Sequence, residues 1–167
     1  CLSRLNGMFS FVIYDKQNKS LFVARDRYGV KPFYYFFDGN SFVFSSEIKG
    51  ILSTKIIGPV LNEAVFYDFV VFNRTDHLEN TCFDQIKNLR PGHCIKINLE
   101  AKQVEVMKWH TLPQEQLFKG TLKEMNAKVL ESVKDSVKMH LVGDVAIGSA
   151  LSGGLDSSII VSLLRDI

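Results

Sequence analysis

The sequence of 167 residues has only three cysteines, a net charge of only +2 and no apolar run long enough to span a membrane. Cys1, Cys82 and Cys94 are too few and too scattered for a disulfide framework, and no cysteine or histidine spacing suits a zinc site. The basic residues are dispersed, so no stripe of lysine and arginine indicates nucleic-acid binding. Residues 1–11 lack the apolar centre of a signal peptide. We therefore expect a cytoplasmic protein that binds neither nucleic acid nor membranes, with Cys82 and Cys94 reduced and buried.

The remaining composition is that of ordinary globular material. Hydrophobic residues make up 46% and charged residues 23% of the chain, which allows one full domain or two partial ones. The histidines are dispersed, and each is interpreted as a surface or packed side chain rather than a ligand. They are His77, His93, His110 and His140.

Short strand patterns fill the first third of the chain. Aromatic and β-branched residues alternate with polar ones or run together there, and polar residues or a glycine separate the runs. The predicted strands occupy residues 8–14, 21–24, 33–37 and 42–45. Their order predicts an antiparallel meander with a polar hairpin loop at residues 15–19.

A helix and a further hairpin are expected after the meander. Asn62 can cap a helix that runs to about Phe72. The proline-glycine turn in residues 88–93 then leads into a strand at 93–97, and residues 104–109 can return as its partner.

The periodicity changes after a polar stretch at residues 111–120, which we interpret as an interdomain linker. Thr121 and Glu124 have the spacing of a capping box and predict a helix start, and Gly143 is the expected stop. One apolar stripe of this helix is predicted to pack on a parallel sheet. It consists of Leu122, Met125, Val129, Val133 and Val137.

A glycine turn near the carboxyl end carries the strongest functional signal. The small apolar residues 145–151 predict a buried strand, and a helix pattern opens at Ser157. Gly153 and Gly154 between them let a ligand approach the backbone, and the first-turn N–H groups of a helix attract phosphate. Asp156 would repel a bare phosphate, so we interpret it as a ligand for the divalent cation of a magnesium nucleotide. Serine hydroxyls of Ser152, Ser157 and Ser158 would add donors.

A simpler interpretation is a surface turn in which Asp156 and Ser157 only cap a helix. The loop is not a Walker A sequence, because no Gly-Lys-Ser/Thr follows. It resembles instead the Ser-Gly-Gly-x-Asp-Ser signature of the ATP pyrophosphatases. That resemblance implies a site for ATP and Mg²⁺, with Asp156 as metal ligand and the pyrophosphate portion held by the loop. The implied binding residues are Leu151, Ser152, Gly153, Gly154, Leu155, Asp156, Ser157 and Ser158.

Three earlier segments resemble the second half of a class II glutamine amidotransferase domain. They are residues 6–11, the Arg-Asp-Arg-Tyr-Gly-Val-Lys-Pro segment within 24–35, and residues 45–52. Followed by the glycine loop, they are similar to the glutamine-hydrolysing asparagine synthetases. Taken without the family, their charged residues are expected to form a surface ion-pair network. These residues are Arg25, Asp26, Arg27, Glu47 and Lys49.

The resemblance implies two different folds in one chain. Residues 1–110 would be the carboxyl-terminal part of an α+β antiparallel amidotransferase domain of the Ntn-hydrolase type. Residues 111–120 would be the linker, and residues 121–167 would begin an α/β parallel-sheet ATP pyrophosphatase domain.

Cys1 has the chemistry of an amidotransferase nucleophile but not the context. In the family a glycine and apolar residues follow the nucleophilic cysteine, whereas Leu2-Ser3-Arg4 follows Cys1. We therefore assign no catalytic residue here, and expect the nucleophile to lie outside a chain that is part of a longer one and inactive alone.

By resemblance, the complete enzyme would be a carbon–nitrogen ligase that uses aspartate, glutamine and ATP, and a homodimer is left open. Relatives that amidate sugars or close β-lactam rings leave the acceptor open as well. A stand-alone ATP pyrophosphatase using free ammonia and a non-catalytic binding scaffold are further alternatives. The Arg-Asp-Arg-Tyr-Gly-Val-Lys-Pro segment argues against the first of these.

Overall fold

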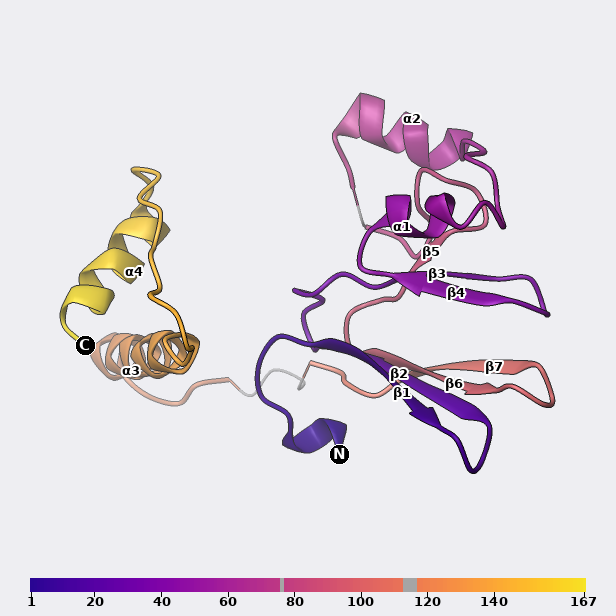
Figure 1. Ribbon diagram of the computed structural model, residues 1–167. Helices are drawn as coiled ribbons and strands as arrows, with labels where there is room; N and C mark the ends of the chain where they lie inside the picture. The colour runs from indigo at the N-terminus through magenta and orange to yellow at the C-terminus, as the bar shows by residue number, and fades with distance from the viewer. Residues whose placement is uncertain (76, 113–116) are drawn as a thin grey trace. The chain divides into compact units, whose positions relative to one another are not determined.

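The computed structural model describes residues 1–75, 77–112 and 117–167 and divides into two compact units, Cys1–Leu112 and Pro113–Ile167 (Figure 1). All the assigned strands belong to the first unit, and the described part of the second unit contains two helices. Of the predicted linker, residues 113–116 lie outside the described residues. Within the described ranges, no helix has the length and apolar content needed to cross a membrane.

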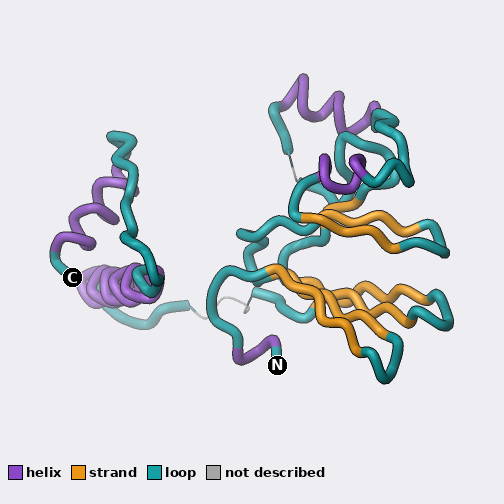
Figure 2. Tube along the Cα trace, viewed as in Figure 1, coloured by secondary structure: helices purple, strands orange, loops and turns teal. Residues whose placement is uncertain are grey.

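The larger sheet of the first unit has four antiparallel strands in the order β1-β2-β6-β7. Their bounds are Ser10–Asp15, Ser20–Arg25, His93–Asn98 and Gln103–Lys108. Figure 2 shows the strands of this unit in orange. The hairpins β1–β2 and β6–β7 are local, whereas β2 pairs with β6 across a long stretch of sequence. The predicted strands and both hairpins are therefore confirmed, with ends shifted by one or two residues.

The smaller sheet has the order β4-β3-β5. Its strands are Tyr34–Phe37 (β3), Phe42–Ser45 (β4) and Lys87–Asn88 (β5). The prediction of one continuous meander is wrong, because β2 takes β6 rather than β3 as its second neighbour. The loop that follows Arg25 carries the chain from one sheet to the other.

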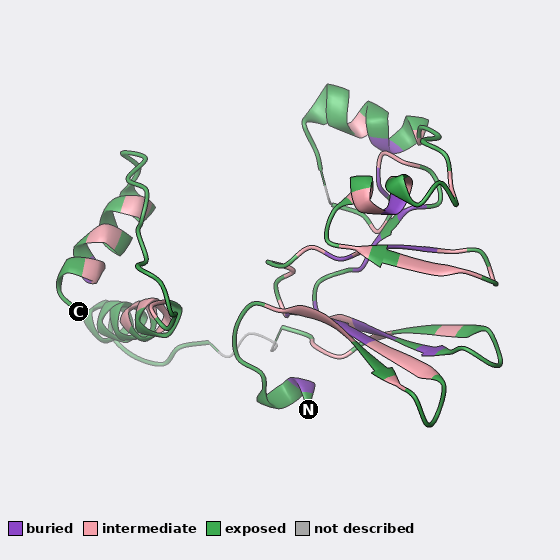
Figure 3. Cartoon of the chain, in the orientation of Figure 1, coloured by how far each residue is buried: buried purple, intermediate pink, exposed green. Residues whose placement is uncertain are grey.

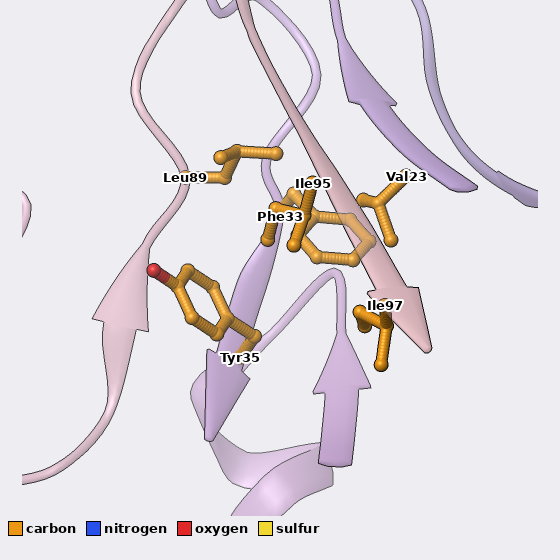
Figure 4. Packing of buried hydrophobic residues seen from close by; sticks show 6 residues of the cluster. All are labelled: Val23, Phe33, Tyr35, Leu89, Ile95 and Ile97. Carbon is orange, nitrogen blue, oxygen red and sulfur yellow. The ribbon is translucent and has the colours of Figure 1, made fainter. Parts of the chain in front are cut away.

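The two sheets pack face to face around the main core. Phe33 and Tyr35 point from the smaller sheet toward Val23 and Ile95 of the larger one, and Leu89 and Ile97 complete the cluster (Figure 4). Side chains alternate along a strand, so the neighbouring Phe36 faces the other way. It packs beneath Ile51 of α1 (Ile48–Ser53), which covers the outer face of the smaller sheet.

Two further helical segments belong to this unit, the 3₁₀ turn η1 (Leu2–Arg4) and α2 (Glu63–Phe72). The Asn62 side chain accepts a hydrogen bond from the N–H of Val65 at 3.2 Å, which confirms the predicted cap. Val65 is the buried residue of α2, and the rest of this apolar helix is exposed or half-buried (Figure 3).

The second unit consists of α3 (Leu122–His140) and α4 (Leu155–Arg165). The predicted capping box is confirmed, because the Thr121 side chain accepts from the Glu124 N–H and the Glu124 carboxylate accepts from the Thr121 N–H. The helix ends at His140, before the predicted stop at Gly143, and α3 contains no buried residue.

The predicted strand at residues 145–151 is wrong in this structure. No strand is assigned in the described part of this unit, and Val145 and Leu151 are 78% and 62% exposed. A strand needs neighbours that satisfy its N–H and C=O groups, and the described part of this unit offers none. Part of the apolar stripe of α3 instead lines a groove with α4. Val129, Val133 and Val137 contribute to it from α3, and Ile160 and Leu164 from α4. The parallel sheet stays a prediction.

Candidate nucleotide-binding loop

The glycine loop lies immediately before α4, as the sequence predicts. Gly153 has φ +82°, a conformation that side chains with a Cβ rarely adopt, and no atom lies within 4 Å of where its Cβ would be. Gly154 is the N-cap residue of α4, and no side chain accepts a hydrogen bond at this cap. The helix therefore begins with backbone donors that no side chain satisfies, beside an open glycine turn, which is the arrangement that binds anions at helix N-termini.

The serine hydroxyls are arranged differently from the prediction. Ser157 Oγ and Ser158 Oγ donate to the Gly154 carbonyl at 3.0 and 2.8 Å, so in this structure they stabilise the turn rather than point donors at a ligand. Ser152 Oγ lies 3.1 Å from Ser157 Oγ. Hydroxyl groups rotate at little cost, and these three can still turn toward an anion.

Asp156 lies in the first turn of α4 and is exposed. Across the described ranges, no group of three or more His, Cys, Asp and Glu side chains is placed to hold a metal ion. A magnesium ion usually keeps several waters and takes one or two carboxylates together with substrate phosphates. One carboxylate beside a phosphate site fits that pattern, whereas a metal held by the protein alone does not. The two leucines of the predicted site, Leu151 and Leu155, are mostly exposed.

The charged segment that begins with Arg25 and Asp26 has a structural role. Arg25 and Asp26 are 7% and 1% exposed, so the prediction that they form a surface ion-pair network is wrong. Arg25 donates through Nε to the Lys31 carbonyl and through Nη2 to the Gly29 carbonyl, both at 2.7 Å. Its Nη1 donates to Asn88 Oδ1 at 2.7 Å and to the Leu89 carbonyl. Arg25 thereby ties the loop to the smaller sheet.

Asp26 holds the same loop from within. Its carboxylate accepts hydrogen bonds from the backbone N–H groups of Tyr28, Val30 and Lys31 at 2.9 to 3.1 Å, and from Phe9 N–H at 3.3 Å. Burial acts to raise the pKa of Asp26, but these backbone donors outweigh it and leave the pKa below its ordinary value. The loop is thus fixed by two buried charges that bond to backbone groups.

Of the other predicted charged residues, Glu47 and Lys49 do form an exposed ion pair at 2.6 Å. Arg27 donates to the carbonyls of Leu5 and Ser3 and lies 5.3 Å from the centre of the Trp109 ring. Sequence reasoning missed the roles of Asn88 and Trp109. Trp109 donates its indole N–H to the Arg25 carbonyl at 3.2 Å, and no sequence spacing signals such a bond.

The three cysteines are free in this structure, and Cys1 is exposed. Cys94 is buried, which confirms the prediction, whereas Cys82 is only half-buried, so the prediction that it is buried is wrong. Burial raises the pKa of the Cys94 thiol, which keeps it protonated and unreactive.

Comparison with known proteins finds two family models that match different parts of the chain. The sequence model of the glutamine amidotransferase domain family matches residues 1–110, and that of the asparagine synthase family matches residues 128–167. The chain is 37% identical to a putative glutamine-hydrolysing asparagine synthetase 2 of Methanocaldococcus jannaschii, over 99% of the chain and 32% of that relative. It is 33% identical to each of the glutamine-hydrolysing asparagine synthetases 3 and 2 of Bacillus subtilis, over 98% and 91% of the chain. The chain spans 26% and 22% of those two relatives.

Proposed function

Because the chain belongs to the glutamine amidotransferase domain family, we propose that it forms part of an ATP-dependent ligase that converts aspartate to asparagine with ammonia from glutamine. The names of the relatives support this substrate pair. The observation that carries the proposal is the union, in one chain, of an amidotransferase match at residues 1–110 with an open glycine loop at the uncapped start of α4.

ATP would supply the activating group, since the side-chain carboxylate of aspartate displaces pyrophosphate from the α-phosphorus and ammonia then displaces AMP. The residues of this chain would bind ATP and orient it. The first-turn N–H groups of α4 would donate to the pyrophosphate oxygens, and the missing Cβ atoms of Gly153 and Gly154 would let those oxygens approach. Asp156 would hold Mg²⁺ together with phosphate oxygens and water. No residue of this chain is proposed as the glutaminase nucleophile.

The domain organisation completes the proposal. Residues 1–110 would belong to the glutaminase side, residues 111–120 would link the parts, and residues 121–167 would open an ATP pyrophosphatase domain with a parallel sheet. The apolar face of α3 supports this division, because a sheet is a natural cover for such a face. A cytoplasmic location and a homodimer remain part of the proposal.

The test is the pair Gly154→Ala and Asp156→Ala, placed in the polypeptide expressed from the complete reading frame. An added Cβ at Gly154 meets only Ser152 Oγ at 3.7 Å, and its φ is not left-handed, so the substitution should fold while obstructing the phosphate. We expect each variant to lose aspartate-dependent pyrophosphate release by about a hundredfold or more, the scale of removing positioned charge stabilisation, while glutaminase activity is retained.

Gly143→Ala is the matched control, since its added Cβ meets only Ile147 Cδ1 at 3.5 Å and it lies outside both the loop and the predicted strand at 145–151. It should leave both activities unchanged. Pyrophosphate release at the unaltered rate in Gly154→Ala and Asp156→Ala would overturn the proposal. Loss of both activities together would show a folding defect. ATP binding by Asp156→Asn would then be measured, and binding as tight as that of the unaltered protein would overturn the proposal.

A further inference from the structure

A cavity of about 320 Å³ opens at one side of the sandwich, away from the glycine loop in sequence and within the first unit. Its lining comes from β3, the segment before β5, β5 and the turn after it, and the strands β6 and β7. The polar side chains that line it and enter the argument are Tyr35, Glu79, Arg90, His93 and Lys108. Its volume lies at the lower end of the range for small-molecule sites.

The strand register explains why basic side chains meet at this place. His93 lies on the same face of β6 as Ile95 and Ile97, because side chains two residues apart share a face, and both isoleucines belong to the core between the sheets. Lys108 lies directly opposite His93 in the β6–β7 pairing. The inward face of the sandwich therefore ends, at this edge, in two basic residues instead of apolar ones.

The lining has an excess of positive charge. Glu79 is the single carboxylate among the lining residues that the structure describes, and it is already engaged by Lys87 Nζ at 2.8 Å and by the Tyr35 hydroxyl at 3.5 Å. Within the described part of the chain, neither Arg90 nor Lys108 forms an ion pair. Arg90 and Lys108 therefore bring two formal positive charges to the lining, against one carboxylate that is already paired.

The hydrogen-bonding roles of two further lining side chains follow from their neighbours. The Nδ1 atom of His93 lies 2.8 Å from the Pro91 carbonyl, which can only accept, so Nδ1 carries the hydrogen and Nε2 is an acceptor that can take a hydrogen bond from a P–OH group of a hydrogenphosphate. Burial, and next the charge of Glu79, raise the pKa of Tyr35 to about 12, so its hydroxyl keeps its proton at neutral pH.

We propose that this cavity binds a phosphate-type oxyanion, with the Arg90 guanidinium and the Lys108 ammonium as its charged donors and His93 as a third contact. A planar guanidinium binds two phosphate oxygens at once, and a lysine adds a point charge. The cavity has room for more than one phosphate group, so pyrophosphate should bind more tightly than inorganic phosphate.

The test is a titration of the ¹⁵N-labelled 167-residue chain with sodium phosphate, and separately with sodium pyrophosphate, at constant ionic strength. We expect saturable amide shifts at Asn88, Arg90, His93 and Lys108. Arg90→Gln and Lys108→Gln should each weaken binding on the order of tenfold, the value of one hydrogen bond to a charged group. Lys108→Arg should retain binding because it keeps the positive charge. This variant, compared with Lys108→Gln, tests the proposal if Arg90→Gln fails to fold.

Lys96→Gln is the matched control, because Lys96 is exposed on the same strand and pairs with Glu105 on the opposite face. It should bind as the unaltered chain does. Gly154→Ala separates this cavity from the glycine loop, since it should leave the shifts at His93 and Lys108 unchanged. Shifts that never saturate, shifts confined to residues 152–158, or an equal loss in Lys96→Gln would each overturn the proposal.

Discussion

In the unit Cys1–Leu112 the side chains of Val23, Ile51 and Ile95 are completely buried, whereas in Pro113–Ile167 the nineteen-residue helix α3 buries none of its residues. Helix α3 also has an apolar stripe, but among the described residues only the first unit has two sheets that meet and remove apolar side chains from water. Helix α3 is stabilised instead by a local feature, the capping box at Thr121. The comparison separates structure made by tertiary packing from structure made by capping.

The largest expected effect comes from a matched pair of truncations, one in each unit. Ile95→Ala should lower the free energy of unfolding of the first unit by about 2–5 kcal/mol, because it leaves a cavity in a fully buried site. Val129→Ala should not reduce helix content, because Val129 is 56% exposed and alanine favours helix. Urea unfolding followed by the fluorescence of Trp109, the single tryptophan, reports the first unit, and far-ultraviolet circular dichroism reports the helices. Cooperative loss of both signals in Val129→Ala would contradict the separation.

A smaller effect is expected from the buried loop carboxylate. Asp26→Asn should cost about 1–3 kcal/mol at neutral pH, because the neutral amide accepts the backbone hydrogen bonds more weakly. The lowered pKa of Asp26 means that its stabilisation is complete above the ordinary carboxyl range and is lost as pH falls through the folded pKa.

Stability should therefore fall less steeply between neutral and acidic pH in Asp26→Asn than in the unaltered chain, as measured by urea unfolding with Trp109 fluorescence. Asp84→Asn, at an exposed position, is the control and should keep the original slope. Parallel curves for Asp26→Asn and the unaltered chain would refute the role of these backbone bonds.

The smallest effect should follow the loss of the helix cap. Thr121→Ala should destabilise α3 by about 1 kcal/mol and lower the helical circular dichroism signal, because the N–H of Glu124 loses its acceptor. The Trp109 unfolding transition should not move, since the first unit has its own core. Thr111→Ala, at an exposed position outside the helix, should change neither signal.

Local features were the predictable part of this fold. Strand alternation, the hairpins, the Asn62 cap and the Thr121 capping box involve residues close in sequence, and all are present. The division into two sheets was not predictable, because the pairing of β2 with β6 joins distant segments and leaves no mark in either one.

Predictions made from charge and apolar content alone were wrong at two places in the chain. Arg25 and Asp26 look like surface residues because their partners are backbone groups, which no sequence pattern displays. Residues 145–151 have strand composition, but composition supplies no neighbouring strand. Of the candidate loop, the glycine turn and the helix start were predictable, while the inward hydrogen bonds of Ser157 and Ser158 were not.

The pairing of Ala24 with Cys94 in the larger sheet has a consequence for biosynthesis. During translation the β1–β2 hairpin leaves the ribosome well before β6, so one edge of β2 stays open to solvent while the intervening residues are made. Closing so long a loop is slow compared with forming a hairpin. The nascent chain therefore passes through a stage in which chaperones can bind the unpaired edge of β2.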